Sequence, residues 1–404
     1  MSPLLCRHCA SLLQHQVIDL GHQPPSNAYL RPEQLGLPEI TYPLQVFVCT
    51  SCWLVQLPAH AAAEELFTAD YAYFSSTSSS WCAHAERFVA AAVERLGLGP
   101  ESRVVELAAN DGYLLQYVQQ RGIPCLGIEP TKATAEAARA KGINTLEYFF
   151  GVELAEQLEP ADLVVANNVL AHVPDINDFV AGIARLLKPL GRASIEFPHL
   201  LRLLAGNQFD TIYHEHFSYL SLRVVQRIAT AAGLAVVDVE ELPTHGGSLR
   251  VWLAHQGAAE ATAAVEAVLS SEAVAGLERL NAYAGFQQRA EAAKHGLLEF
   301  LLQAKRQGRC VLGYGAAAKG NTLLNYAGVR ADLLPAVADR APSKQGKVLP
   351  GSHIPVISPE QFLSEAPDAI LVLPWNLNEE LRQQLPDTEL VTAIPDLRHW
   401  KRGR

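Results

Sequence analysis

Short apolar runs alternate with amphipathic helical stretches through the middle of the chain. Residues 104–107 have the pattern of a buried strand that ends in a loop of small residues, and a second apolar run ends at Glu129. Helical periodicity over 83–96 precedes these strands, and helices over 131–141 and 179–187 follow them. Because parallel neighbours need a crossover connection, this order predicts a βαβ unit of the nucleotide-binding type.

The same alternation extends toward the C-terminus. Strands are predicted over 144–149, 161–173 and 193–200, long helices over 258–307, and a second strand, glycine turn and helix over 310–324. Strands that alternate with helices favour a parallel sheet covered by helices. We therefore predict an α/β fold with two Rossmann-type units.

The loop after the first strand indicates the kind of nucleotide. Its sequence, E-L-A-A-N-D-G, lacks the three-glycine spacing that a dinucleotide pyrophosphate needs at a helix N-terminus. Glu129, at the next strand tip, can accept hydrogen bonds from both ribose hydroxyls. We favour S-adenosylmethionine (SAM) over a nicotinamide dinucleotide, with a doubly wound domain that keeps no cofactor as the alternative. The predicted cofactor contacts are strand-tip residues, namely Glu106, Ala108, Asn110, Asp111, Gly112, Glu129, Asn167 and Asn168.

Composition narrows the class of protein. The 404 residues are 49% hydrophobic, which suits two or three ordinary domains. A formal net charge of −10 argues against a broad electrostatic grip on nucleic acid. No apolar run approaches the ~18 residues of a membrane span, and the N-terminus lacks a signal-peptide pattern. We expect a cytoplasmic protein without nucleic-acid or membrane partners; the oligomeric state stays open.

Four of the seven cysteines form two C-x-x-C pairs near the N-terminus, Cys6 with Cys9 and Cys49 with Cys52. Two such pairs can surround a tetrahedral Zn²⁺ with four thiolates, which leaves no open position for catalysis. The sequence therefore predicts a structural zinc site. Disulfides are the alternative, and a reducing compartment disfavours them.

A serine-rich stretch, 70–81, separates the second cysteine pair from the first helix. Its composition predicts a loop, and its aromatic residues Tyr71, Tyr73 and Phe74 could cover a bound ligand. A flexible linker is the alternative.

The stretch 208–222, QFDTIYHEHFSYLSL, carries more titratable groups than a loop needs for stability. A neutral imidazole is a competent base near neutral pH, and a nearby carboxylate or phenol can orient it. This crowding favours proton abstraction. A metal site at His214, Glu215 and His216 is one alternative, although their spacing suits a metal less than i, i+4 on a helix, and a solvated loop is another.

Three further sites carry candidate chemistry. His172 either faces a substrate or caps a helical turn. The sequence HGGSLR combines a glycine pair with His245 and Arg250, which suits either a substrate grip or a plain hairpin. Lys319, in the second glycine turn, can meet a phosphate, unless that unit serves packing only. The predicted substrate contacts are His214, His245, Arg250, Lys319 and Asn321.

Taken in order, the motifs resemble one family. The paired cysteines, E-x-A-x-N-D-G-Y-L, NNVLAHV, EFPHL, Y-H-E-H-F-S-Y-L-S, H-G-G-S-L-R and G-Y-G-A-A-A-K-G-N-T resemble the three-domain sugar C-methyltransferases of deoxysugar biosynthesis over nearly the whole chain. The resemblance implies a zinc-binding domain over 1–68, a Rossmann-type SAM-dependent methyltransferase domain over 69–256, and a helical bridge with a second Rossmann-like domain over 257–404. It also implies a nucleotide-linked 4-keto sugar as substrate.

The resemblance further implies a reaction centre lined by Tyr213, Glu215, His216 and His172, with His216 as the base. One departure is Ala108, where the family commonly has glycine and where an added methyl could crowd the cofactor. A ketone at C4 acidifies the hydrogen on C3, so a base can form an enolate that takes the methyl group at carbon. The alternatives are methylation of another small-molecule acceptor at oxygen or nitrogen, and a non-catalytic zinc-ribbon or RNA-binding protein.

Overall fold

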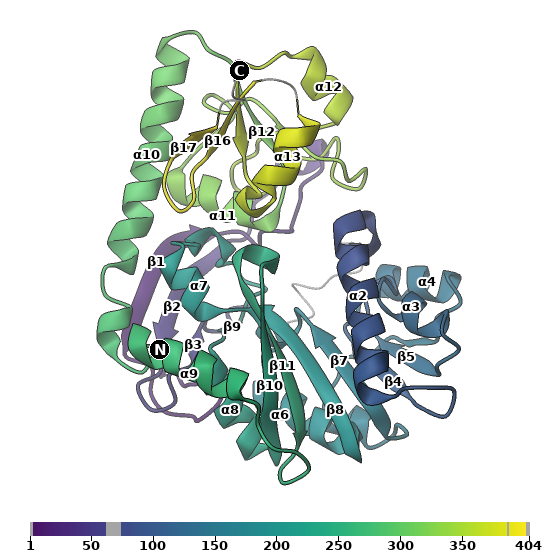
Figure 1. The fold of residues 1–404 in the computed structure, drawn as a ribbon. Helices are drawn as coiled ribbons and strands as arrows, with labels where there is room; N and C mark the ends of the chain where they lie inside the picture. The colour runs from purple at the N-terminus through teal and green to yellow at the C-terminus, as the bar shows by residue number, and fades with distance from the viewer. Residues whose placement is uncertain (1–2, 62–73, 386–387, 401–404) are drawn as a thin grey trace.

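Three β-sheets make up the protein. The computed structural model describes residues 3–61, 74–385 and 388–400. In Figure 1 a seven-stranded sheet lies at the bottom, a six-stranded C-terminal sheet at the top, and a smaller N-terminal sheet to the left between them. The mixed α/β fold with two Rossmann-type units confirms the fold-class prediction.

The N-terminal sheet has the strand order β1-β2-β3-β9. Its strands are β1 (His15–Gln23), β2 (Tyr42–Val48), β3 (Val55–Gln56) and β9 (Ser218–Tyr219), and a 3-10 helix, η1 (Pro32–Gln34), lies between the first two. Alternate residues of β2 are buried, as expected for a strand with one face on a core. The fourth strand comes from the stretch crowded with titratable groups, so this stretch is anchored on the N-terminal sheet.

The seven-stranded sheet has the order β10-β11-β8-β7-β4-β5-β6, and β11 runs opposite to the other six strands. Its strands are β4 (Val104–Leu107), β5 (Cys125–Ile128), β6 (Thr145–Leu146), β7 (Ala161–Asn167), β8 (Leu187–Pro198), β10 (Leu234–Leu242) and β11 (Ser248–His255). The chain moves outward through β5 and β6 and then returns to β7, so β4 lies at the point where the strand order reverses. Ligands of open α/β sheets bind at such a point, outside the carboxyl ends of the strands.

Helices cover both faces of this sheet (Figure 1). They are α2 (Ser79–Leu96), α3 (Leu115–Gln119), α4 (Lys132–Ala140), α5 (Val152–Ala155), α6 (Ile176–Leu186), α8 (Leu222–Ala231) and α9 (Ala263–Ala275). This part of the chain also has α7 (Leu200–Ala205), which packs in the core of the N-terminal sheet, and the 3-10 turns η2 (Ser75–Thr77), η3 (Leu170–His172), η4 (Phe209–Thr211) and η5 (Thr244–Gly246). The described part of the serine-rich stretch is therefore partly helical, because Trp81 belongs to α2 instead of a loop. Its residues 70–73 lie outside the described ranges.

The C-terminal sheet has the order β14-β13-β12-β15-β16-β17, parallel except for β17. Its strands are β12 (Val311–Tyr314), β13 (Val337–Ala338), β14 (Val356–Ile357), β15 (Ala369–Val372), β16 (Glu389–Thr392) and β17 (Arg398–Trp400), and its helices are α10 (Phe286–Arg306), α11 (Ala318–Ala327), α12 (Pro359–Ser364) and α13 (Asn378–Gln384), with η6 (Leu280–Ala282) and η7 (Trp375–Leu377).

One hydrophobic core joins the N-terminal sheet to the C-terminal unit. It contains Leu44 and Val46 of β2, Leu297 of α10 and Leu324 of α11. A second core joins Cys6, Cys49 and Cys52 to the seven-stranded sheet and to α9, whose apolar face includes Val268. The three parts are therefore packed together continuously.

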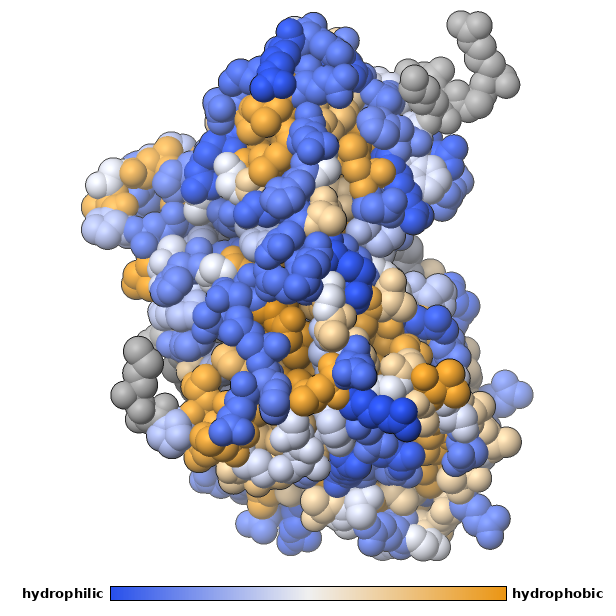
Figure 2. Space-filling view, turned by 90° about the vertical axis from the view of Figure 1, so that its left-hand side faces the viewer, coloured by the Kyte–Doolittle hydropathy of each residue, from blue (hydrophilic) through white to orange (hydrophobic). Residues whose placement is uncertain are grey.

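Hydrophilic residues cover much of the face that contains α10, with apolar residues in separate patches (Figure 2). Within the described ranges no helix is both long and apolar enough to cross a membrane.

Candidate functional site

The four predicted metal ligands lie together. The Sγ atoms of Cys6, Cys9, Cys49 and Cys52 are all within 4.8 Å of one another. Two of these pairs, Cys6–Cys52 and Cys9–Cys49, are 3.5 Å apart. A tetrahedral four-thiolate zinc site with Zn–S bonds of ~2.3 Å separates its sulfurs by about 3.8 Å, so the donors fit Zn²⁺.

The two cysteine pairs use the same local turn. In each, the residue after the second cysteine, Ala10 or Trp53, has a positive φ and donates its backbone N–H to the carbonyl of the first cysteine. Gln56 of β3 also donates a side-chain N–H to Cys6 Sγ at 3.1 Å. These turns aim the thiolates at one point, and the amide donor supports a thiolate ligand.

The cofactor-loop residues lie at the carboxyl edge of the seven-stranded sheet. Glu129 follows β5, and its carboxylate accepts hydrogen bonds from Asn110 N at 2.9 Å and from Thr131 N at 2.9 Å. Oε2 therefore points at the loop after β4, Oε1 points at Thr131, and the carboxylate retains acceptor capacity for a ribose. Glu106, at the end of β4, is 1% exposed, and burial raises its pKa well above the ordinary value.

The loop backbone is contorted. Ala108 has φ +54° and Asn110 has φ +49°, both in the left-handed region. Gly112 has φ +74°, and a Cβ there would lie 2.3 Å from Ile143. The left-handed backbone at position 108 suits a glycine better than the alanine of this chain.

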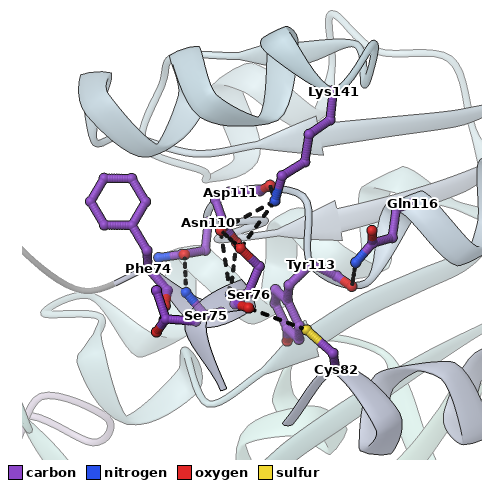
Figure 3. A network of polar contacts seen from close by, with 10 residues as sticks. Phe74, Ser75, Ser76, Cys82, Asn110, Asp111, Tyr113, Gln116 and Lys141 are labelled. Atoms are coloured by element: carbon purple, nitrogen blue, oxygen red, sulfur yellow. Dashed lines mark hydrogen bonds and ion pairs between the residues drawn. The ribbon is translucent and has the colours of Figure 1, made fainter. Parts of the chain in front are cut away.

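Two predicted cofactor ligands are already bonded to the segment that precedes α2 (Figure 3). Asn110 Oδ1 accepts the backbone N–H of Ser75 at 2.8 Å, and the Asp111 carboxylate accepts hydrogen bonds from the N–H and hydroxyl of Ser76. Lys141 donates to the Asp111 carbonyl at 2.7 Å and to its carboxylate at 3.2 Å. These contacts, which the sequence did not predict, hold the 74–76 segment beside the cofactor loop.

Buried polar atoms at this edge fit a SAM molecule. Glu106 Oε2 and the side-chain amide atoms of Asn167 and Asn168 are buried and have no hydrogen-bond partner in the described part of the chain. Such groups are costly unless something pairs with them. SAM carries two positive charges and several hydrogen-bonding groups, so it suits the acidic and amide groups at the ends of β4 and β7.

The histidine of the crowded stretch is held in one tautomer. His216 Nδ1 lies 2.8 Å from the Thr211 carbonyl, which only accepts, so Nδ1 carries the proton and Nε2 the lone pair of the neutral ring. Burial, then the nearby His172, lowers the pKa of His216 well below 6.5. The ring is therefore a neutral imidazole whose lone pair is on Nε2.

Other predicted residues surround this ring. The ring centroids of Tyr213 and His172 lie 3.9 and 4.6 Å from that of His216. His245, in η5, contacts the Trp81 ring at 5.2 Å, and burial lowers its pKa to about 4 with the Lys319 charge as the next cause. Elements from two sheets thus bring His172, Tyr213, His216, His245 and Lys319 to one region.

Four predicted site residues contact other partners. His214 is buried, with its ring centroid 5.8 Å from that of Tyr42. Glu215 is buried and accepts a hydrogen bond from Asn27 at 3.1 Å, so the Thr211 carbonyl, not this carboxylate, bonds His216 Nδ1. Asn321 donates to the Ser26 carbonyl at 2.6 Å, deep in the joint between the N-terminal and C-terminal parts.

Arg250 is the fourth of these residues. It is 6% exposed and donates to Glu196 at 3.0 Å and to Glu240 at 3.2 Å. Glu196 also contacts His84 at 2.9 Å and accepts the Thr244 hydroxyl at 3.1 Å. The arginine therefore supports η5, next to His245, through a buried ion-pair network that the sequence pattern did not reveal.

The fold and the edge chemistry define a SAM-dependent methyltransferase with a structural zinc site, and comparisons with known proteins agree. Family models match the chain as a putative zinc binding domain over 6–67, a methyltransferase domain over 81–239, and a C-methyltransferase C-terminal domain over 243–395. The chain is 36% identical over 381 residues to the C-methyltransferase NovU of Streptomyces niveus, which covers 93% of this chain and 90% of that protein. The chain therefore belongs to this family of C-methyltransferases.

Two further similarities cover only part of the chain. The ubiquinone biosynthesis O-methyltransferase of Aeromonas salmonicida (strain A449) is 27% identical over 158 residues, which are 34% of this chain and 64% of that protein. The structure of magnesium protoporphyrin IX methyltransferase (ChlM) from Synechocystis PCC 6803 with bound SAM matches with a TM-score of 0.34 and 16% identity, over 42% of this chain and 79% of that one. Membership of the C-methyltransferase family favours methylation at carbon over the O- and N-methylation alternatives.

Proposed function

We propose that the protein methylates C3 of a nucleotide-linked 4-keto deoxysugar, with His216 as the base. The observation that carries this proposal is the hydrogen bond from His216 Nδ1 to the Thr211 carbonyl, which leaves Nε2 as a fixed basic nitrogen. The relative from Streptomyces niveus is a C-methyltransferase, and a carbon acceptor needs a base to become a nucleophile.

The proposed reaction balances in protons and electrons. His216 Nε2 takes the C3 proton, the C3–H bonding pair becomes the C3–C4 π bond, and the C4 carbonyl oxygen takes the negative charge. SAM, when bound, would supply an electrophilic methyl group: the C3–C4 π pair would form the C3–CH₃ bond, a lone pair on the C4 oxygen would restore the carbonyl, and the S–CH₃ bonding pair would stay on sulfur. His172 and Tyr213 are the ring neighbours of the base and would face the sugar with it.

The substrate would lie between the seven-stranded sheet and the C-terminal unit. Glu106, Glu129 and Asn167 would hold SAM at the ends of their strands, as the unpaired polar atoms and the position of Glu129 support. The C-terminal unit would hold the nucleotide end of the sugar, with α11 and Lys319 at its edge. Arg250 and Asn321 would act through the elements that they support.

The test is deuterium exchange in D₂O with a panel of 4-keto sugar nucleotides, including TDP-4-keto-6-deoxyglucose, with the demethylated product in place of SAM. The wild-type enzyme should exchange deuterium into C3, and His216→Asn should slow exchange and turnover by ~10²–10⁴-fold with unchanged SAM affinity. His295→Asn, at an exposed position of α10, is the matched control and should behave as the wild type. Exchange at the wild-type rate in the His216 variant would show that the base lies elsewhere.

A further inference from the structure

Lys319 lies close to the base because its helix packs on the turn that holds the base. It is the second residue of α11, and one helical turn later the Thr322 hydroxyl donates to the Ile212 carbonyl at 2.8 Å. Ile212 directly follows Thr211, whose carbonyl accepts the His216 Nδ1 proton. The first turn of α11 is therefore anchored beside the residue that orients the imidazole.

The ammonium group of Lys319 is held by two neighbours from η7. It donates to Asn376 Oδ1 at 2.7 Å and lies 4.7 Å from the ring centroid of Trp375, a distance typical of a cation–π contact. Among the described residues, Asn376 accepts one of the three N–H donors of the ammonium, which leaves the others to meet a third group.

Trp375 connects this cation to both sides of the cluster. Its Nε1–H donates to Asp210 Oδ2 at 2.7 Å, and Asp210 is the neighbour of Thr211 in η4. Its ring also contacts the loop of His245, because a Cβ added at Gly246 would lie 2.5 Å from it. One aromatic side chain thus fixes the cation relative to both η4 and η5.

We propose that Lys319 is a further catalytic residue, whose ammonium stabilises the negative charge on the C4 oxygen of the enolate, and that Trp375 and Asp210 position it. The inference rests on the proposed function and names the charge that Lys319 meets. Proton abstraction at C3 leaves charge on an oxygen bonded to the adjacent carbon, so a fixed cation beside the base is where it is needed. No exogenous reactant is involved, because the step moves one proton to His216 Nε2 and one electron pair to oxygen.

The location of the charge favours the enolate over the substrate's diphosphate. Burial is the main cause of the lowered pKa of His216 and of His245, and the positive charge of Lys319 lowers the pKa of both rings further. A diphosphate is attached at C1 and lies several bonds from the reacting carbon, whereas the C4 oxygen lies next to it. Burial also lowers the pKa of Lys319 itself, and Asp210, through its charge, opposes that shift.

The test distinguishes the enolate oxygen from the diphosphate as the group that Lys319 contacts. It measures nucleotide affinity and the deuterium exchange rate on the same variants. Lys319→Met and Lys319→Arg are compared with Lys305→Met, which removes an exposed surface lysine of α10. Calorimetry with TDP and UDP reports the diphosphate contact, and the C3 deuterium exchange rate at saturating sugar nucleotide reports enolate formation. Lys319→Met should slow exchange by ~10²-fold or more, the usual effect of losing one donor to an oxyanion, with the nucleotide Kd unchanged within about threefold.

The remaining outcomes are also decisive. Lys319→Arg should recover part of the exchange rate, and Trp375→Phe, which keeps an aromatic ring but loses the N–H, should slow exchange by roughly tenfold with unchanged nucleotide affinity. A nucleotide Kd weakened about tenfold with exchange at the wild-type rate would assign Lys319 to the diphosphate and overturn the inference. Wild-type exchange and affinity in Lys319→Met would also overturn it. If the wild-type enzyme exchanges with no member of the panel, the proposed function fails instead.

Discussion

Loss of zinc should disable proton abstraction while leaving SAM binding intact. The segment that carries His216 pairs directly with β3 of the zinc-containing part, whereas the proposed SAM loop follows β4, whose strand partners are β5 and β7. The perturbation is the double variant Cys6→Ser/Cys49→Ser, which removes one thiolate from each cysteine pair and with it the structural metal.

The size of the expected effect follows from the contacts between the His216 segment and the N-terminal part. Strand β9 pairs with β3, Leu57 N donates to the Phe217 carbonyl at 3.0 Å, and Asn27 donates to Glu215 at 3.1 Å. Each interaction has a net contribution of ~1 kcal/mol, so together they hold the His216 segment by about 3 kcal/mol. Loss of that amount changes the population of the active arrangement by on the order of a hundredfold.

The assay combines three measurements on the purified variants. Elemental analysis should give about one zinc per chain in the wild type and none in the double variant. The C3 exchange rate should fall by up to ~10²-fold, and the SAM Kd from calorimetry should stay within about threefold. Cys310→Ser, at an isolated cysteine outside the zinc site, is the control. A zinc-free variant with wild-type exchange, or one that loses SAM affinity in parallel with exchange, would refute the reasoning.

Three further predictions concern the cofactor loop and the base. Glu129→Ala should weaken SAM binding by roughly tenfold through loss of ribose hydrogen bonds, and an unchanged calorimetric Kd would remove that role. Ala108→Gly should raise the free energy of unfolding, measured by urea denaturation, by up to about 1 kcal/mol. The reason is that relief of the left-handed φ outweighs the extra entropy of a glycine in the unfolded chain. A loss of stability would contradict this prediction. Burial lowers the pKa of His216 well below 6.5, so the neutral base should predominate at and above pH 6.5. We therefore expect kcat/KM to fall only at lower pH. A fall in kcat/KM that begins at or above pH 6.5 would contradict this assignment.

The predictable part of the site follows from topology. The carboxyl ends of parallel strands converge on one edge, so Glu106, Glu129 and Asn167 lie together without any knowledge of loop detail. The zinc ligands were predictable because cysteine spacing alone specifies the turn that each pair adopts. Contact of these strand-tip residues with SAM stays a prediction.

The unpredicted part depends on partners that are distant in sequence. The sequence predicts that Arg250 binds the substrate, yet in the structure its partners are Glu196 of another strand and His84 of α2. Asp111 reads as a cofactor ligand, yet it bonds Ser76 and Lys141. A polar residue at a strand end or in a loop has the same sequence signature whether it meets a ligand or a buried ion-pair partner, so only the packed structure separates the two.

The crowded stretch owes its composition to its position among all three parts of the protein. Asp210 bonds Trp375 of the C-terminal unit, Ile212 accepts a hydrogen bond from α11, and Glu215 accepts one from the N-terminal part. Between these anchors lie the carbonyl that fixes the His216 tautomer and the aromatic ring of Tyr213. Because a base must be held within a fraction of an ångström of a productive position, a short loop needs such anchors from several directions. The contacts between the three parts account for much of the density of polar residues in this stretch, and catalysis would account for the rest if His216 is the base. The sequence therefore pointed to this stretch more readily than to the role of each residue in it.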